Sequence, residues 1–355
     1  MRGESALFQL ILTFAVGLAT GLLFRKLKVP GGMMIGAIIG VAALGVTTEM
    51  ASMPYYAKFV AQTTAGAFIG CSIEKSDIKR MPKLIKPLVT LLVIYLIVNL
   101  TVGFIIWKTT PVDLTTALMS AVPGGMSDTP IIAADMGANA AQVAVLQFVR
   151  MTVGIGFFPW LIQKIDIKYG SDEADSKGDD HVREKTSDKN IKIFAATLVV
   201  AVVGGVIGRM LGIPAGVLVF SMIAVMVFKL TSGHGYLPMW AKRLAQVLSG
   251  AYVGSGITRS DLFELKYLVL PALTILVFYT ANCLLTGYLM RSRFGFSRKV
   301  SMLIATPAGA SDMALISSDI GVNSTDLIVI QVARMILVIS IFPQVIQLVA
   351  NALGG

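Results

Sequence analysis

Residues 121–130 read AVPGGMSDTP, and residues 305–314 read ATPAGASDMA. Both stretches place helix-breaking Pro and Gly residues beside a Ser-Asp pair, and both lie in apolar surroundings. Their prolines, Pro123 and Pro307, are 184 residues apart (307 minus 123). The same separation relates further pairs of identical residues: Gln62 and Gln246, Gly66 and Gly250, Pro87 and Pro271, Asn139 and Asn323, Arg150 and Arg334. A fixed period of this kind indicates an internal duplication, so we expect two halves with the same fold.

The composition excludes an ordinary soluble domain. Of the 355 residues, 55% are hydrophobic and only 14% are charged, and the mean hydropathy is +0.77. The apolar residues come in blocks of roughly 17 to 25, which is the length of helix that crosses the hydrocarbon core of a bilayer. We therefore predict an all-α polytopic membrane protein with the lipid bilayer as its surroundings.

A charged stretch separates the two halves. Residues 166–190 are rich in Ser, Asp, Lys and Glu and contain few apolar residues, which is typical of a solvated linker. We therefore expect a first membrane repeat over residues 1–165, a cytoplasmic charged linker over 166–190, and a second membrane repeat over 191–355. Six apolar segments are recognisable in each repeat.

The distribution of basic residues predicts that the repeats have opposite orientations in the membrane. Residues 74–86 carry five Lys or Arg, whereas the equivalent residues 258–270 carry two. The bias then reverses, since residues 291–299 carry four and the equivalent residues 107–115 carry one. Lys and Arg collect in cytoplasmic loops, so this reversal indicates an inverted repeat of the kind found in many secondary transporters.

Inversion requires an odd number of crossings in each repeat, so one of the six segments should not cross. The Gly- and Pro-broken segments, residues 114–136 and 298–320, are the best candidates. We expect about ten transmembrane helices plus two re-entrant hairpins; twelve spans with parallel repeats is the alternative. The expected location is a bacterial inner (plasma) membrane, with the linker in the cytoplasm and both termini outside.

The broken segments are also the first candidates for a substrate or ion site. Irregular backbone at membrane depth is tolerated where it lines a protein cavity, and carboxylates inside a membrane are functional candidates. A Ser-Asp pair at the start of a half-helix would cap it, its N–H groups would favour an anion, and the carbonyls of the turn could coordinate Na⁺. A cap without a binding role is the alternative. These candidates are Gly124, Gly125, Ser127, Asp128, Gly309, Ser311 and Asp312.

Further polar residues lie inside or beside the apolar segments. Gln147 and Arg150 share one face of the last segment of their repeat, and a buried Arg needs a carboxylate such as Asp128 or a substrate anion. The equivalent pair is Gln331 and Arg334. Gln62 and Gln246 are candidates for lining a cavity, and the secondary candidates near the hairpin ends, with capping or solvation as their alternative roles, are Asp135, Asn139, Asp319 and Asn323.

Several other features favour structural roles. The glycines Gly66 and Gly250 are expected to let helices approach closely. Cys71 and Cys283 lie in or beside apolar segments and form no metal or redox motif. With only two His residues, a catalytic metal centre is not expected, and the net charge of +10 is attributed to membrane orientation, since no nucleic-acid-binding motif is present.

The stretches PGGMSDTPIIAADMGANAAQVAVLQFVRM and TPAGASDMALISSDIGVNSTDLIVIQVARM resemble the membrane AbrB family, a duplicated bacterial family also labelled as a regulator of aidB expression and as an ammonia monooxygenase. The resemblance covers both halves and the position of the linker, and it implies a bacterial membrane location. The monooxygenase label conflicts with the scarcity of metal ligands in the sequence. In the motif alone, the paired hairpins are similar to those of the citrate and glutamate symporter families, which implies a substrate and ion site there.

Two functions of different classes remain open. The first is an elevator-like secondary transporter of a small anionic metabolite, coupled to H⁺ or Na⁺ and using no other cofactor. The second is a membrane sensor or regulatory protein with a transporter-like fold, and an intramembrane aspartyl protease is a distant third. We expect no enzymatic activity and no nucleic-acid partner. A homodimer is compatible with transport by a moving bundle, although no residue pattern marks a dimer face.

Overall fold

The computed structural model describes residues 2–29, 31–169, 191–307, 317, 322 and 324–353. All regular elements within these ranges are helices. Six helices in this part of the chain are long and apolar enough to cross a membrane: α1 (Arg2–Lys26), α4 (Lys75–Thr109), α7 (Ala140–Tyr169), α8 (Ile191–Met210), α12 (Val269–Phe294) and α15 (Thr325–Ala352). The prediction of an all-α polytopic membrane protein is confirmed.

Four helices of 17 residues each complete the long elements: α2 (Gly32–Thr48), α3 (Tyr55–Cys71), α9 (Gly216–Ser232) and α10 (Met239–Ser255). The bounds of α2 and α3 recur in α9 and α10 at the 184-residue separation found in the sequence. At about 1.5 Å per residue each of the four is about 26 Å long. Of the four, α2 and α9 are apolar. The number of spans and the orientation of each stay predictions.

The first broken segment consists of two half-helices, α5 (Leu114–Ser120) and α6 (Thr129–Asp135), joined by an irregular stretch over residues 121–128. Each half-helix has seven residues and a length of about 10 Å, which is a third of the hydrocarbon thickness. Neither can cross a membrane alone. In the second repeat α13 (Arg298–Ile304) is the equivalent of α5. The re-entrant course of these segments stays a prediction.

Helix α4 begins earlier than the apolar pattern of the sequence suggests. The apolar pattern begins near residue 84, but the helix already begins at Lys75. A capping box explains this, because Glu74 and Asp77 exchange side-chain and backbone hydrogen bonds at the first turn. The basic residues that follow are good helix formers. In the second repeat the same stretch forms the short helix α11 (Arg259–Glu264) and a 3₁₀ turn over Leu265–Leu268.

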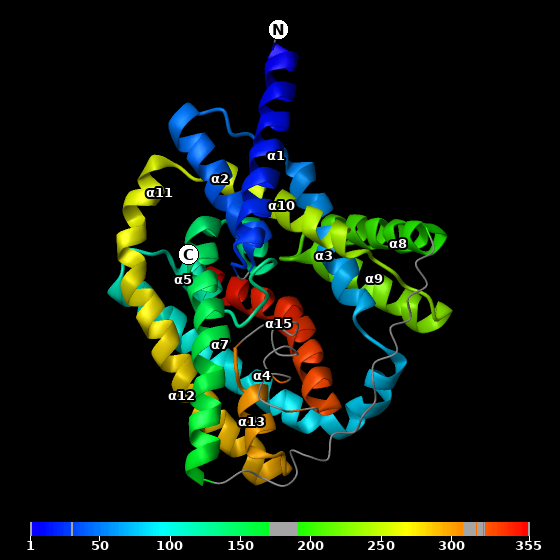
Figure 1. Cartoon of the computed structure of the whole chain (residues 1–355), viewed down its shortest axis with the longest axis vertical. Helices are drawn as coiled ribbons and strands as arrows, with labels where there is room; N and C mark the ends of the chain where they lie inside the picture. The colour runs from blue at the N-terminus through cyan, green and yellow to red at the C-terminus, as the bar shows by residue number, and fades with distance from the viewer. Residues whose placement is uncertain are drawn as a thin grey trace.

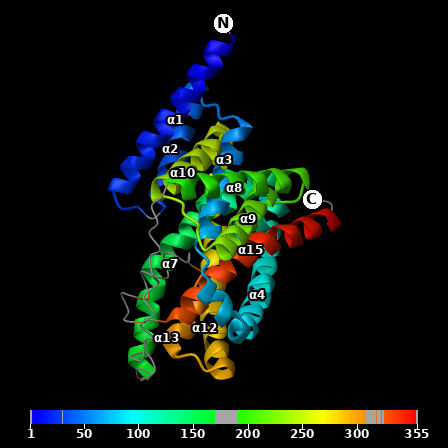
Figure 2. The same ribbon diagram turned by 90° about the vertical axis from the view of Figure 1, so that its right-hand side faces the viewer.

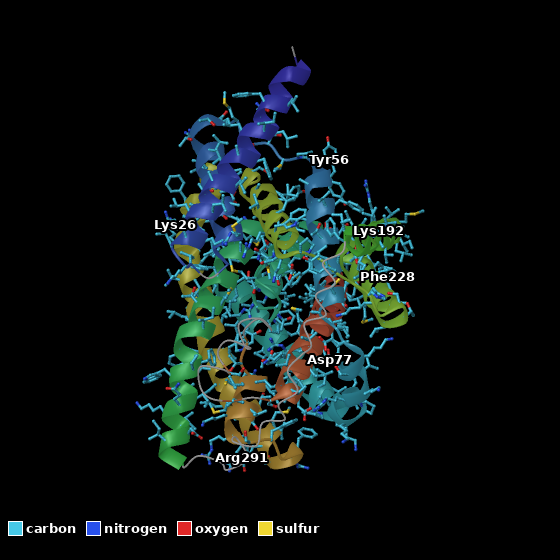
Figure 3. The ribbon with its side chains drawn as sticks, turned by 45° about the vertical axis from the view of Figure 1, so that its right-hand side comes forward. Lys26, Tyr56, Asp77, Lys192, Phe228 and Arg291 are labelled. Atoms are coloured by element: carbon cyan, nitrogen blue, oxygen red, sulfur yellow. The ribbon has the colours of Figure 1, made fainter. Side chains whose placement is uncertain are left out.

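The helices are arranged in two bundles. The first three helices of each repeat, α1–α3 and α8–α10, pack against one another and form what we call the scaffold bundle. The remaining helices, α4–α7, α11–α13 and α15, form the hairpin bundle. Most of this bundle lies in the lower part of the molecule, whereas α11 reaches up beside α2 (Figures 1 and 2). In Figure 3, Tyr56 marks the start of α3 near the top, and Asp77, in the first turn of α4, lies in the lower half. Helix α3 therefore leads the chain from the scaffold to the hairpin bundle.

Glycines hold the scaffold helices in close contact. A Cβ atom at Gly66 of α3 would lie 2.4 Å from the carbonyl oxygen of Leu218 in α9. The equivalent Gly250 of α10 faces Met34 of α2, where the corresponding distance is 2.5 Å. The two contacts are reciprocal, since Leu218 and Met34 are also equivalent residues of the two repeats. The packing role predicted for these glycines is confirmed, and the reciprocity indicates a pseudo-two-fold relation between the repeats.

Gly66→Ala is expected to lower the free energy of unfolding by about 1–3 kcal/mol, because the added methyl group must push α3 away from the α9 backbone. The midpoint of thermal unfolding of the detergent-purified protein measures this effect. Gly156→Ala in α7 is the matched control, because no atom lies within 4 Å of a Cβ placed there. Equal midpoints for the two variants would show that the α3–α9 contact can open without cost.

Candidate functional site

A cavity of about 210 Å³ lies where the first hairpin meets helices α3 and α10 of the scaffold. Side chains of α7 and α15 complete its wall. Its polar lining consists of Ser127, Asp128, Lys242, Gln246 and Ser249, and its larger apolar side chains are Phe68, Ile69, Met126, Ile131, Met151 and Met335. The volume is below the roughly 300–1,000 Å³ of sites for drug-sized ligands, so the cavity suits a smaller molecule.

Asp128 is the carboxylate of this cavity. The residue is 9% exposed, and its side chain makes no hydrogen bond or ion pair within the described part of the chain. Asp128 occupies the N-cap position of α6, but its side chain accepts no hydrogen bond from the helix. The prediction that this side chain caps the half-helix is therefore wrong. The backbone turns tightly beside it, because a Cβ atom at Gly125 would lie 2.5 Å from Asp128 Oδ2. Gly125 therefore leaves room for the carboxylate.

Helix α10 supplies the polar residues that face the start of α6. Gln246 Nε2 donates to Ser127 Oγ at 3.1 Å, and Ser249 Oγ donates to the Ser127 carbonyl at 3.4 Å. Lys242 lies one turn before Gln246, with its Nζ 3.9 Å from the centre of the Phe68 ring. Gln246 and Ser127 thus lie together at the cavity, as expected of candidate binding residues.

Helix α3 binds the other end of α6. Lys58 Nζ pairs with Asp135 Oδ1 at 2.5 Å, and Gln62 Nε2 donates to Asp135 Oδ2. Lys58 is 3% exposed, and its ammonium also lies 5.2 Å from the centre of the Tyr252 ring. The Asp135 side chain is 20% exposed. Asp135 is therefore an interbundle contact, although the residue as a whole is exposed. Gln62 binds Asp135 and is not among the described residues that line the cavity.

The guanidinium of Arg150 holds the two broken segments together. It donates to the carbonyl oxygens of Gly124, at 2.7 Å, and of Pro307, and to Gln147 Oε1. Gln147 Nε2 in turn donates to the carbonyl of Val122 at 2.9 Å. The expected ion pair between Arg150 and Asp128 is absent from the described contacts. Backbone carbonyls, which a sequence motif does not reveal as partners, occupy much of the hydrogen-bonding capacity of this Arg.

The second repeat shows the equivalent arrangement. Arg334 Nη1 donates to the carbonyl of Thr306 at 2.9 Å and to Tyr95 Oη at 3.2 Å. Gln331 Nε2 donates to the carbonyl of Leu303 at 2.7 Å. Arg334 is 2% exposed. The Gln–Arg pairs therefore bind the interrupted backbone from inside the protein, and neither pair lines the cavity.

Asn139 caps a helix, as one reading of the sequence expected. Its Oδ1 accepts from the N–H groups of Ala141 and Gln142, both at 3.2 Å, at the start of α7. Its Nδ2 donates to Asp261 Oδ1 at 2.8 Å. Burial raises the pKa of Asp261, but hydrogen bonds from Thr258 and Asn139 outweigh burial and hold the pKa below its usual value. Asn139 thus connects α7 to α11 and lies outside the cavity.

The equivalent candidates of the second hairpin lie outside the described residues: Gly309, Ser311, Asp312, Asp319 and Asn323. Their roles stay predictions. Within the part of the chain that the structure describes, no three or more His, Cys, Asp or Glu side chains gather as metal ligands would.

Two pairs of residues are important in the structure and were missed in the sequence. Tyr279 Oη donates to the carbonyl of Ala121, and Tyr95 Oη donates to Ala305 at 2.8 Å, so each tyrosine binds the hairpin of the other repeat. Lys58 and Lys242 are the second pair. In both pairs the two residues are identical and 184 positions apart, so the repeat in the sequence could have identified them. Lysines within apolar stretches were a further signal, because such charges are costly in a membrane.

Comparison with known proteins gives a consistent result. A family model described as "Transition state regulatory protein AbrB" matches residues 2–166 and 60–350. The Bacillus subtilis (strain 168) protein YhjN is 26% identical over 274 residues, which cover 74% of this chain and 71% of that protein. The Escherichia coli (strain K12) protein named "Putative regulator AbrB" is 21% identical over 332 residues and 92% of both chains.

Proposed function

The chain belongs to the membrane AbrB family, and from that premise we propose that it is a secondary active transporter of a small metabolite with an anionic group. Transport is coupled to H⁺ or Na⁺, and the hairpin bundle moves against the scaffold in an elevator-like manner. The observation that carries the proposal is Asp128, a buried carboxylate without a hydrogen-bonding partner among the described residues, which lines a cavity between the two bundles.

The first argument concerns the charge of Asp128. A buried carboxylate without a partner is costly in the interior of a membrane protein, because its lost hydration is not replaced. A proton or Na⁺ at the cavity removes that cost. A cation bound at Asp128 and a substrate bound in the cavity therefore affect each other's affinity, and coupled transport requires such a linkage.

The second argument concerns the substrate. Lys242 is the only described cation in the cavity lining and supplies attraction for an anionic group. Most of the remaining wall is apolar, so the substrate carries an apolar body of modest size. Arg150 and Arg334 are assigned to the support of the hairpins, since their described hydrogen bonds go to carbonyls and to Gln147 and Tyr95 side chains.

The third argument concerns movement. The described polar contacts between the bundles are few. Asp135 binds Lys58 and Gln62, and Ser127 binds Gln246 and Ser249. Two further contacts go to scaffold carbonyls, from Arg259 to Val46 and from Gln344 to Pro214. The helices within each bundle are packed more extensively, for example by the Gly66 and Gly250 contacts. Two bundles that are packed extensively within themselves and joined by fewer contacts favour sliding over internal rearrangement.

This proposal includes the setting of the protein. It is a multi-pass protein of the bacterial inner membrane with the linker in the cytoplasm and both termini outside, and it works without an enzymatic step or a cofactor other than the coupling ion. A homodimer is compatible with this mechanism. The alternative is a membrane sensor or regulator of the same fold, which the regulator name of the Escherichia coli relative favours.

Asp128→Asn is expected to reduce uptake into proteoliposomes by about tenfold or more, since each 1.4 kcal/mol of lost ion-binding free energy corresponds to a factor of ten. A thermal-shift screen of small carboxylates, with and without Na⁺ and at two pH values, identifies the substrate to use, because bound ligands stabilise by mass action. Asp326→Asn is the control, because Asp326 pairs with Arg80 on the surface. Ligand-induced stabilisation without flux in the wild-type protein would support the sensor and contradict the transporter.

A further inference from the structure

Helix α4 extends well beyond its apolar part. Residues 87–107 contain no charged side chain and form about 31 Å of helix, which matches the roughly 30 Å hydrocarbon core of a bilayer. The helix already begins at Lys75, about 18 Å before this part. Its first turns, residues 75–86, therefore extend into the layer of lipid headgroups.

Four lysines share one face of these first turns, at spacings of four, four and three residues. All four are exposed, and their ammonium groups make no hydrogen bond or ion pair with a described residue. We call this set the lysine face: Lys75, Lys79, Lys83 and Lys86. Nearby charges do not neutralise it, because Glu74 and Asp77 form the capping box and Asp326 pairs with Arg80 at 3.3 Å.

An apolar stripe runs beside the lysine face. Ile78 and Ile85 precede Lys79 and Lys86 by one position and are 46% and 50% exposed. Leu84, on the opposite side of the helix, is buried in the protein core. Adjacent cationic and apolar stripes on an exposed helix are typical of segments that lie in the headgroup region of a bilayer.

The equivalent stretch of the second repeat is used differently. Asp261 and Glu264 of α11 accept hydrogen bonds from Asn139 and Gln142 of the α7 start, both at 2.8 Å. Arg259 donates to the carbonyl of Val46 at 3.1 Å. These side chains are committed to contacts within the protein. The lysine face is therefore not a requirement of the repeated fold, and its cations are available to a partner outside the protein.

We propose that the lysine face binds the phosphate headgroups of anionic phospholipids, while Ile78 and Ile85 contact the acyl chains. Each lysine near an anionic membrane surface strengthens binding by roughly fivefold. Membrane orientation requires only an excess of basic residues, whereas a binding face requires them on one side of a helix, as in α4. Because α4 follows α3, the bound phospholipid lies at the connection between the scaffold and the hairpin bundle. This inference is independent of the proposed transport function.

The test compares two phospholipids that have the same acyl chains, using the full-length protein in detergent. Dioleoyl phosphatidylglycerol is anionic, and dioleoyl phosphatidylcholine has no net charge. Native mass spectrometry measures the concentration at which half of the protein retains a bound lipid. We expect this concentration to be at least about tenfold lower for phosphatidylglycerol, and the preference to shrink at high salt because exposed charges are screened. Glycerol 3-phosphate, a headgroup without acyl chains, should compete only at concentrations at least about tenfold higher.

Variants locate the site. The triple variant Lys75→Gln, Lys79→Gln and Lys83→Gln should weaken phosphatidylglycerol binding by at least about tenfold. Arg at the same three positions keeps the charge and should preserve binding. The matched control removes three exposed cations at the end of α1: Arg25→Gln, Lys26→Gln and Lys28→Gln. All of these side chains are exposed, so each variant should unfold at the wild-type temperature.

The outcomes are decisive in both directions. Equal weakening by the α4 and α1 triple variants would show that overall charge attracts the lipid, and it would overturn the lysine face as a site. Unchanged binding by the α4 triple variant, equal binding of the two phospholipids, or competition by glycerol 3-phosphate at the concentration of the lipid would each overturn it too. If the triple variant is unstable, Lys79→Gln and Lys83→Gln are tested singly, and each should weaken binding by roughly fivefold.

Discussion

Asp135→Asn is expected to lower the free energy of unfolding by about 3–5 kcal/mol, the cost of leaving a buried ion without its partner. The variant keeps the shape of the side chain and removes its charge, so the Lys58 ammonium, 3% exposed between α3 and the hairpin bundle, loses its counter-charge. The unfolding midpoint of the purified protein measures this loss. A second expected effect is a weaker contact between the bundles, because the Lys58–Asp135 pair joins them.

The double variant Lys58→Met with Asp135→Asn provides the control. Removing both charges eliminates the uncompensated ammonium, so the double variant should be closer to the wild type than Asp135→Asn alone. The pair between Arg80 and Asp326 is a second control, because its side chains are 29% and 42% exposed and exposed pairs contribute about 0–1 kcal/mol. Equal losses for Asp135→Asn and Asp326→Asn would contradict a structural role for the Lys58 contact.

Arg150→Met is expected to lower the free energy of unfolding by about 3–5 kcal/mol and to remove the response to ligand. The guanidinium binds the carbonyls of Gly124 and Pro307 and the side chain of Gln147, and each buried acceptor left without a donor costs about 1–3 kcal/mol. Because Gly124 adjoins the turn that carries Asp128, the cavity should lose its shape together with its support. Thermal unfolding and ligand-induced shifts measure the two effects.

Arg150→Lys distinguishes support from direct substrate binding. An ammonium keeps the positive charge but cannot reproduce the planar fork that reaches several acceptors together, so Arg150→Lys should lose nearly as much stability as Arg150→Met. Full stability combined with a lost ligand response would instead place Arg150 among the substrate-binding residues. Arg334→Met should behave like Arg150→Met, because Arg334 also binds a backbone carbonyl in the broken segment of its own repeat, that of Thr306.

Much of the architecture was predictable from local pattern. The 184-residue separation predicted the equivalence of helices such as α3 and α10, and the lengths of the apolar blocks predicted helices long enough to cross a membrane. The start of α4 was missed because its first turns are basic, and a hydropathy pattern does not register a capping box. A proline in a helix interior commonly kinks or ends the helix, but Pro159 lies inside α7 without ending it.

The candidate site was predictable only in part. The Pro-Gly turn and Asp128 were identified, because breakers and carboxylates inside apolar stretches are unusual. Gln246 was correctly placed at the cavity, whereas Gln62 at the equivalent position binds Asp135 instead. Equivalent residues therefore have different surroundings in this conformation, which a repeat in the sequence cannot reveal.

The sequence by itself determined the membrane setting, the duplication and the residues that interrupt the helices, because these follow from local composition and from one fixed period. Only the tertiary structure decided the partners: Lys58 with Asp135, Tyr279 with the Ala121 carbonyl, and Arg150 with Gly124 and Pro307. The physical reason is that a buried polar group takes whichever donor or acceptor the packing brings near it. Backbone carbonyls, which every residue carries, leave no trace in the amino-acid sequence.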